Sequence, residues 1–244
     1  MSPVLAIARR ELRAYFATPL AAVFIVIFLL LAGAATFYLG GFFEAGQADL
    51  QLFFRFHPWL YLLLVPAVSM ALWAEERKSG TLELLLTQPV HTWQAVLGKF
   101  LAAWAFIALA LALTFPLWLT VNWLGEPDNG VILASYLGSL LMAGAYLAVG
   151  SCLSALTRSQ VVAFVLTILA CLLLLLAGFP LALDPLRAFL PQAAVDAASG
   201  LSFLTHFQQI MRGVLDLRDV LYFLLAIAAW LLATVLVIEI RKAD

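Results

Sequence analysis

Residues 99–124 read KFLAAWAFIALALALTFPLWLTVNWL, an apolar stretch whose only charged residue is Lys99 at its first position. A helix that crosses the hydrocarbon core of a bilayer needs about 20 mostly apolar residues, so this stretch is long enough to span a membrane. In lipid the backbone must satisfy its own hydrogen bonds. An uninterrupted apolar run of this length therefore predicts a helix and not a barrel strand.

Five further runs of the same kind lie on either side of this stretch. The chain has 244 residues, of which 65% are hydrophobic and 11% are charged, and its mean hydropathy is +1.06. An ordinary soluble domain is about 45–50% apolar, so no water-soluble fold would hide this much apolar surface. The sequence predicts an all-α integral membrane protein that forms one domain over residues 1–244. Its six predicted transmembrane helices are residues 20–39, 58–74, 99–124, 132–156, 161–183 and 220–240.

The basic residues set the predicted orientation, because cytoplasmic loops of membrane proteins are enriched in Lys and Arg. With the N-terminus inside, the cytoplasmic side carries Arg9, Arg10, Arg13, Arg77, Lys78, Lys99, Arg158, Arg241 and Lys242. The outer side carries only Arg55, Arg187, Arg212 and Arg218. This asymmetry predicts that both termini are cytoplasmic.

The first sixteen residues have a helical pattern of their own. Apolar residues recur on one face of residues 2–16, and Arg9, Arg10 and Arg13 lie beside them. The pattern predicts an amphipathic helix along the inner membrane surface, with its cations near anionic headgroups. Pro19 then starts a new direction of the chain. A cleaved signal peptide is the alternative, but the apolar run is longer than an h-region of about 7–15 residues, and five more runs follow.

The apolar runs lack the groups that several function classes need. They contain no Asp, Glu, Lys or Arg near a predicted midplane, whereas ion-coupled carriers usually place such a group there. Cys152 and Cys171 lie inside apolar runs without a CxxC pairing, and the three histidines are far apart in sequence. The sequence therefore predicts no metal site and no cofactor in this chain. The formal net charge of −1 gives no sign of a nucleic-acid partner.

The most charged stretch lies between the second and third predicted spans, where residues 75–90 read EERKSGTLELLLTQPV. Gly80 breaks what precedes it, and Thr81 is placed to cap the first turn of a new helix. Glu83 lies in that turn, where the helix dipole favours an anion. Pro89 ends the helix about two turns later, and Thr92 is placed to cap the next one. The loop over residues 75–92 thus predicts a short Leu-rich helix on the cytoplasmic surface, suited to docking on a partner.

Residues 76–89, ERKSGTLELLLTQP, resemble the signature of type-2 ABC-transporter permeases. In that family this stretch forms the coupling helix, which contacts the ATPase subunit. The resemblance implies that ATPase coupling in this chain involves Glu76, Gly80, Thr81, Leu82, Glu83, Leu84, Leu85 and Pro89.

A second stretch, residues 203–223, is similar to the region before the last span in gliding-motility-type permeases, whose relatives include the permease that serves copper-site maturation of nitrous-oxide reductase. The resemblance to the family covers essentially the whole chain: the amphipathic start, the six spans, the coupling loop and the segment before the last span. It implies an elbow helix at residues 2–16 and a re-entrant helical segment within the outer region 184–219. The candidate contacts of this region are His206, Arg212, Asp216, Arg218 and Asp219. Its Arg and Asp residues are expected to form ion pairs, either as surface pairs or as contacts to cargo.

The chain has no Gly-x4-Gly-Lys-Ser/Thr phosphate loop, so ATP and magnesium are expected on a separate ATPase subunit. The resemblance implies a non-enzymatic permease subunit, most consistent with an exporter, in the bacterial inner (cytoplasmic) membrane. Its implied partners are two ATPase copies, a second permease copy, membrane lipids and a periplasmic accessory subunit. The cargo is left open. The alternatives are an ion-coupled secondary carrier, a membrane scaffold, and an intramembrane enzyme built on Glu75-Glu76 or on Gly150-Ser151.

Overall fold

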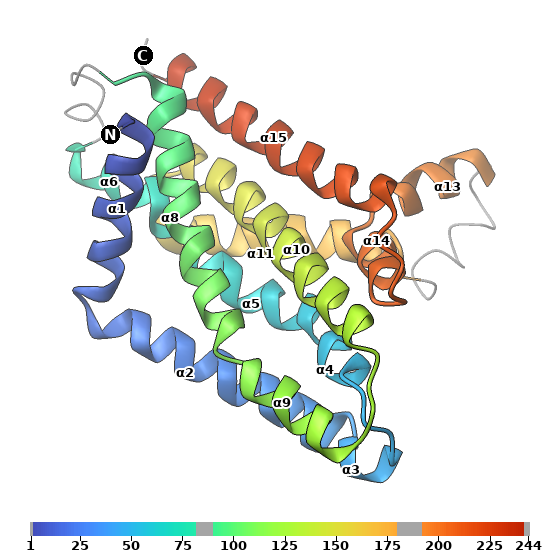
Figure 1. Ribbon diagram of the computed structural model, residues 1–244. Helices are drawn as coiled ribbons and strands as arrows, with labels where there is room; N and C mark the ends of the chain where they lie inside the picture. The colour runs from blue at the N-terminus through green and yellow to red at the C-terminus, as the bar shows by residue number, and fades with distance from the viewer. Residues whose placement is uncertain (1, 82–89, 180–191, 242–244) are drawn as a thin grey trace.

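The computed structural model describes residues 2–81, 90–179 and 192–241, and these residues form helices without any strand (Figure 1). The all-α prediction is confirmed. Five helical segments are long and apolar enough to cross a bilayer, and each overlaps one of the six predicted regions. They are Ala21–Leu39, His57–Ser79, Thr92–Leu124, Asn129–Leu156 and Leu217–Ile240.

A sixth apolar helix, α11 (Gln160–Leu176), lies where the fifth span is predicted. It has 17 residues, which is the lower end of the length that spans a hydrocarbon core. The predicted span runs on to residue 183, and residues 180–191 lie outside the described part of the chain. The count of six spans and the orientation stay predictions.

The N-terminal helix α1 (Pro3–Phe16) occupies the place of the predicted surface helix, and it packs along α8 (Thr92–Ala112). A Cβ on Gly98 would lie 2.8 Å from Cγ2 of Ile7, so the glycine lets the two helices approach closely. Thr18 is extended, and Pro19 opens the next helix. This helix is α2 (Pro19–Ala34), which continues into the π-helical turn η1 (Ala35–Leu39).

The second membrane segment is bent and extends further than predicted. After the short helices α3 (Phe42–Ala45) and α4 (Gln51–Arg55), helix α5 (His57–Ser69) meets α6 (Ala71–Ser79) at Met70. Pro66 has no N–H to donate within the helix, which favours a bend here. Residues 75–79 were predicted as loop but form the last turns of α6, because no helix breaker comes before Gly80.

The third segment is also interrupted. Helix α8 ends at Ala112, and α9 (Phe115–Leu124) follows after a break at Leu113–Thr114. Pro116 lacks the N–H that would continue the helical hydrogen bonds, which accounts for the break. The prediction that Thr92 caps α8 is wrong. His91 is the N-cap, and it forms a reciprocal capping box with Gln94.

Helix α10 (Asn129–Leu156) is the centre of the bundle (Figure 1), and α5, α8, α11 and α15 (Leu217–Ile240) pack around it. Small residues permit this packing. A Cβ on Gly150 would lie 2.0 Å from Oγ of Ser69, and one on Gly138 would lie 2.7 Å from Cγ2 of Ile210. The hydroxyl of Tyr61 is also hydrogen bonded to that of Ser139, at 2.7 Å.

The bundle has two distinct ends. Both termini of the chain lie at one end, with the end of α6, and we call this the terminal end (Figure 1). There Nη1 of Arg77 donates to the carbonyl of Ala155 at 2.6 Å, and Nη1 of Arg241 donates to that of Leu156 at 2.8 Å. The opposite end, which we call the distal end, contains α3, α4 and α14 (Phe203–Ile210). The short helix α13 (Gln192–Gly200) precedes α14.

Candidate functional site

The resemblance to a coupling motif places the candidate site where α6 ends. Of its residues, Leu82, Glu83, Leu84, Leu85 and Pro89 lie outside the described part of the chain. The structure does describe the start of the motif. Gly80 follows Ser79 in a left-handed conformation with φ +73°, which is the usual glycine position after a helix C-terminus.

Hydroxyl groups close this end of α6. The hydroxyl of Ser79 donates to the carbonyl of Glu75 at 2.9 Å and is hydrogen bonded to the hydroxyl of Thr81 at 2.9 Å. Because the single hydroxyl proton of Ser79 goes to Glu75, the Thr81 hydroxyl donates to that of Ser79, and the carbonyl of Glu76 lies 3.4 Å from the Thr81 hydroxyl. The residues on both sides of Gly80 are therefore bonded back to α6, so the chain leaves the helix in a defined direction.

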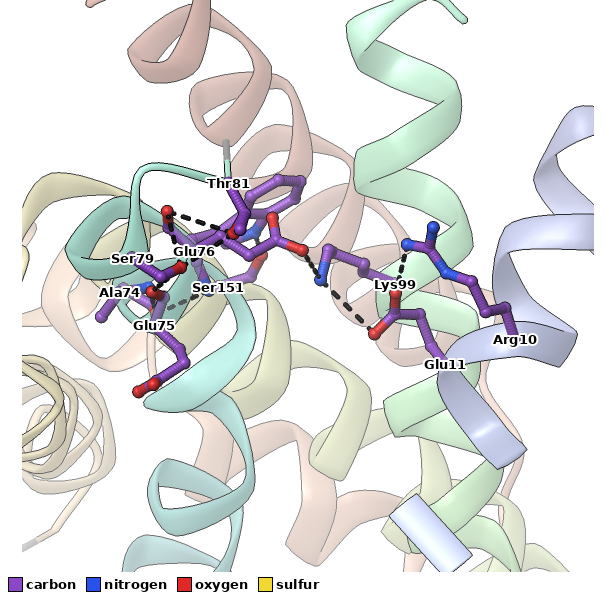
Figure 2. Close-up of polar contacts among 11 residues, drawn as sticks. Arg10, Glu11, Ala74, Glu75, Glu76, Ser79, Thr81, Lys99 and Ser151 are labelled. Atoms are coloured by element: carbon purple, nitrogen blue, oxygen red, sulfur yellow. Dashed lines mark hydrogen bonds and ion pairs between the residues drawn. The ribbon is translucent and has the colours of Figure 1, made fainter. Parts of the chain in front are cut away.

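A buried ion-pair network joins α6 to two other helices (Figure 2). The ammonium of Lys99, on α8, lies 2.8 Å from Oε1 of Glu76 and 3.4 Å from Oε2 of Glu11, on α1. Glu11 also pairs with Arg10 at 2.7 Å. The Lys99 side chain is only 5% exposed, whereas those of Glu11 and Glu76 are 20% and 19% exposed. One cation thus connects α1, the end of α6 and the first half of α8.

The electrostatics of this network depend on Lys99. A buried ammonium is costly unless it is paired, and here two carboxylates and the ring of Trp73, 5.3 Å away, surround it. Burial alone would raise the pKa of the Glu11 carboxyl, but Lys99 and Arg10 outweigh burial and hold that pKa below its ordinary value. Oε2 of Glu76 is buried and has no hydrogen-bond partner within the described residues.

A second set of contacts fixes α6 to the central helix α10. The indole N–H of Trp73 donates to the hydroxyl of Ser151 at 3.0 Å. The hydroxyl of Ser154 accepts from the backbone N–H groups of Trp73 and Ala74, each at 3.1 Å, and donates to the carbonyl of Met70 at 2.8 Å. These bonds satisfy backbone groups at the bend between α5 and α6. Ser151, a nucleophile in the enzyme alternative, has a structural contact here.

Sequence reasoning missed most of this network. In the sequence prediction Lys99 is only one of the basic residues that set the orientation of the chain. The prediction does not assign Glu11, Trp73, Ser151 or Ser154 to the site. The available signal was the position of Lys99 within a helical apolar pattern that begins at Thr92. A lysine at such a place needs a partner, but its partner Glu11 is 88 positions away in sequence.

The other candidate residues lie at the distal end. Nδ1 of His206 is 2.6 Å from Oδ1 of Asp219, and both side chains are buried. Nε2 of His206 lies 3.0 Å from the carbonyl of Gly200, which can only accept, so Nε2 carries a proton. The contact with Asp219 requires another proton between the two groups. The ring also stacks on Tyr222, with centroids 3.8 Å apart, and the pair therefore joins α14 to α15.

The predicted Arg–Asp ion pairs are absent from the described part of the chain, and this expectation is corrected. Asp219 pairs with His206. Asp216 is the N-cap of α15, where it accepts from the backbone N–H of Arg218 at 3.0 Å. Arg212 lines a cavity with Arg55. A capping carboxylate satisfies the helix terminus in preference to an exposed pair of small value.

A family model described as "ABC-2 family transporter protein" matches residues 5–240, from α1 to the end of α15. The search of curated proteins found no match.

Proposed function

Because the chain belongs to the ABC-2 transporter family, and is thus a permease component of an ABC transporter, we propose that the end of α6 couples it to a separate ATPase subunit. The observation that carries this proposal is the Glu11–Lys99–Glu76 network. It fixes the helix that leads into the coupling motif to α1 and α8.

The proposed mechanism is transmission of rigid-body motion. Closure of two ATPase subunits on ATP displaces the segment that follows Gly80. Helix α6 is hydrogen bonded to Ser151 and Ser154 of α10 and is joined through Lys99 to α1. Because these contacts leave no flexible connection between α6 and α10, the displacement is transmitted to the central helix. Coupling by docked helices needs such an element with few internal degrees of freedom.

The finer assignments are part of the same proposal. We place the chain in a bacterial inner membrane, as one of two permease copies with a periplasmic accessory subunit. The similarity of residues 203–223 to gliding-motility-type permeases supports this branch and supports export. The charge asymmetry of the loops supports a cytoplasmic position for the coupling motif.

The test is affinity purification of the tagged chain from its native membranes in mild detergent, followed by mass spectrometry and an ATPase assay. We expect an ATPase with a phosphate loop to co-purify with the wild type. Glu83→Lys should abolish co-purification or uncouple ATP hydrolysis from transport, because it reverses a charge within the motif.

The matched control is Glu126→Lys, which makes the same charge reversal at the distal end. It should co-purify with the ATPase as the wild type does. Both variants should elute as the wild type does in size-exclusion chromatography. A wild-type chain recovered without any ATPase, or full transport by Glu83→Lys, would refute the proposed coupling.

A further inference from the structure

Two adjoining cavities open at the distal end, between α4–α5 and α14. The smaller has a volume of about 250 Å³ and the larger about 470 Å³. Arg55, Leu204 and Gln208 line both, so the two cavities meet along these side chains. Because they share these side chains, we treat them as two chambers of one candidate site, to which the coupling proposal assigns no role.

The smaller chamber is cationic. The guanidinium-bearing side chains of Arg55, at the end of α4, and Arg212, just after α14, both line it, together with the amides of Gln51 and Gln208. Neither arginine has an ion pair within the described residues, and those residues contribute no carboxylate to either chamber. Both arginines are exposed, and two guanidinium groups in the lining of one chamber favour an anion with several acceptor oxygens.

The acidic groups of this end are kept apart from the two arginines. Asp49, Glu126 and Asp128 line a third cavity of about 450 Å³ on the other side of α4. Gln51 lines both this cavity and the cationic chamber. The acidic cavity shares only Gln51 with the smaller chamber, and none of its three carboxylates is among the described residues that line that chamber.

The larger chamber is mostly apolar and aromatic. Its lining includes Leu39, at the end of the first membrane segment, with Phe56, Trp59 and Phe179. The rings of Trp59 and Phe179 meet edge to face at 6.1 Å, and Trp59 is 42% exposed. Aromatic side chains at the ends of spans are typical of the headgroup region of a membrane.

We propose that the two chambers together bind an amphiphilic anion. A phosphate or a comparably charged head lies between Arg55 and Arg212, and the adjoining apolar part lies against Trp59 and Phe179. The inference rests on the proposed function, and it deepens that function by naming the class of cargo.

The test is isothermal titration of the full chain in phosphatidylcholine nanodiscs, with empty nanodiscs as the reference. The probes are dihexanoyl phosphatidic acid, dihexanoyl phosphatidylcholine and inorganic phosphate. We expect saturable binding of the phosphatidic acid, at least about tenfold tighter than that of phosphate. Arg55→Gln and Arg212→Gln should each weaken it about tenfold, because each removes a charge-assisted contact.

Two further variants separate charge from apolar contact. Arg218→Gln removes a positive charge from an exposed residue of the same end that lines neither chamber, and it should change the affinity less than about twofold. Trp59→Ala should weaken the binding of phosphatidic acid and leave the binding of inorganic phosphate unchanged.

Three results would overturn the proposal. The first is that phosphatidylcholine binds as tightly as phosphatidic acid, and the second is that inorganic phosphate does so. The third is that Arg55→Gln or Arg212→Gln binds phosphatidic acid no more weakly than Arg218→Gln does. Co-purification of the ATPase is measured on the same preparations. It should persist in all variants, and its absence from the wild type would contradict the coupling proposal and not the binding site.

Discussion

At the scale of single residues, Lys99 determines how three helices meet at the terminal end. Its ammonium is nearly excluded from solvent and pairs with two carboxylates that come from different helices. Removing one partner of a buried pair is far more costly than replacing all partners, because the remaining charges keep their desolvation cost. This asymmetry makes the network testable by substitution.

We expect Lys99→Met to lower stability by roughly 2–3 kcal/mol. This is less than the 3–5 kcal/mol typical of a fully buried pair, since both carboxylates are about one-fifth exposed. The measurement is thermal unfolding in detergent at pH 7. In the triple variant Glu11→Gln/Glu76→Gln/Lys99→Met, much of the loss should be recovered. If the triple variant is as unstable as Lys99→Met, packing of the lysine stem matters and its charge does not.

The Glu11 carboxyl should give part of the stability a pH dependence. Its pKa is lower in the folded chain than in the unfolded chain, so its contribution is complete above the ordinary glutamate value of about 4.3 and disappears as the pH falls through the lower folded value. We expect the melting temperature of the wild type to fall more steeply than that of Glu11→Gln between pH 5 and the acid limit of about pH 3. Parallel curves would contradict a role for this carboxyl.

At the scale of the elements, a buried polar pair, His206 and Asp219, joins α14 to α15 beside aromatic contacts between the two helices. The side chains of His206 and Asp219 are 7% and 1% exposed, and their contact is shorter than an ordinary hydrogen bond between neutral groups. This pair positions α14, and α14 provides Leu204, Phe207 and Gln208 to the cationic chamber. Loss of the pair should therefore affect both stability and the distal cavities.

We expect Asp219→Ala to lower stability by about 3–5 kcal/mol, because it leaves the buried imidazole without its acceptor. The control is Asp216→Ala, three positions earlier, which removes only the N-cap of α15 and should cost about 1 kcal/mol. Both are read out by thermal unfolding under the same conditions. Equal losses from the two variants would show that the His206 pair does not hold α14 in place.

The elements also show what the sequence could predict. Apolar runs of about 20 residues located the membrane segments, and the motif at residues 76–89 indicated the family that the comparison confirms. The gliding-motility branch stays a prediction. The helix ends were less predictable. Residues 75–79 are polar, but they continue a helix that has no breaker before Gly80.

The polar contacts were the least predictable part. Glu11 and Lys99 are 88 positions apart, and Tyr61 and Ser139 are 78 apart. No local pattern pairs such residues. The reverse error occurred at Asp216, which was expected to pair with an arginine of the outer segment, whereas its carboxylate caps a helix. Pairing of polar groups depends on how the helices pack, which composition and periodicity do not determine.

At the scale of the whole molecule, α10 connects the two ends. Its 28 residues correspond to a length of about 42 Å. Near its C-terminus Ser151 and Ser154 hold α6, and near its N-terminus Gly138 packs on Ile210 of α14. Helix α10 therefore contacts both α6 and α14, so a displacement of α6 can be transmitted through this one helix to the element that lines the cationic chamber.

The ends at which successive helices start and finish predict how many times the chain crosses the membrane. Helix α10 starts at the distal end and finishes beside Arg77 at the terminal end. Residues of α14 line a cavity together with Arg55, so α14 lies at the distal end. Helix α11, between them, must return to the distal end, and α15 comes back so that Arg241 contacts Leu156. With 17 residues α11 is long enough to make this crossing.

We expect single cysteines to report this path in right-side-out membrane vesicles, after the buried Cys152 and Cys171 are replaced by alanine. A membrane-impermeant maleimide should label Gln47→Cys and Asp196→Cys directly, and Arg158→Cys only after permeabilisation. All three positions are exposed. Labelling of Asp196→Cys together with Arg158→Cys would show that α11 does not cross. Direct labelling of Arg158→Cys, with Gln47→Cys and Asp196→Cys labelled only after permeabilisation, would show the inverted orientation. That orientation would place the coupling motif on the side without ATP.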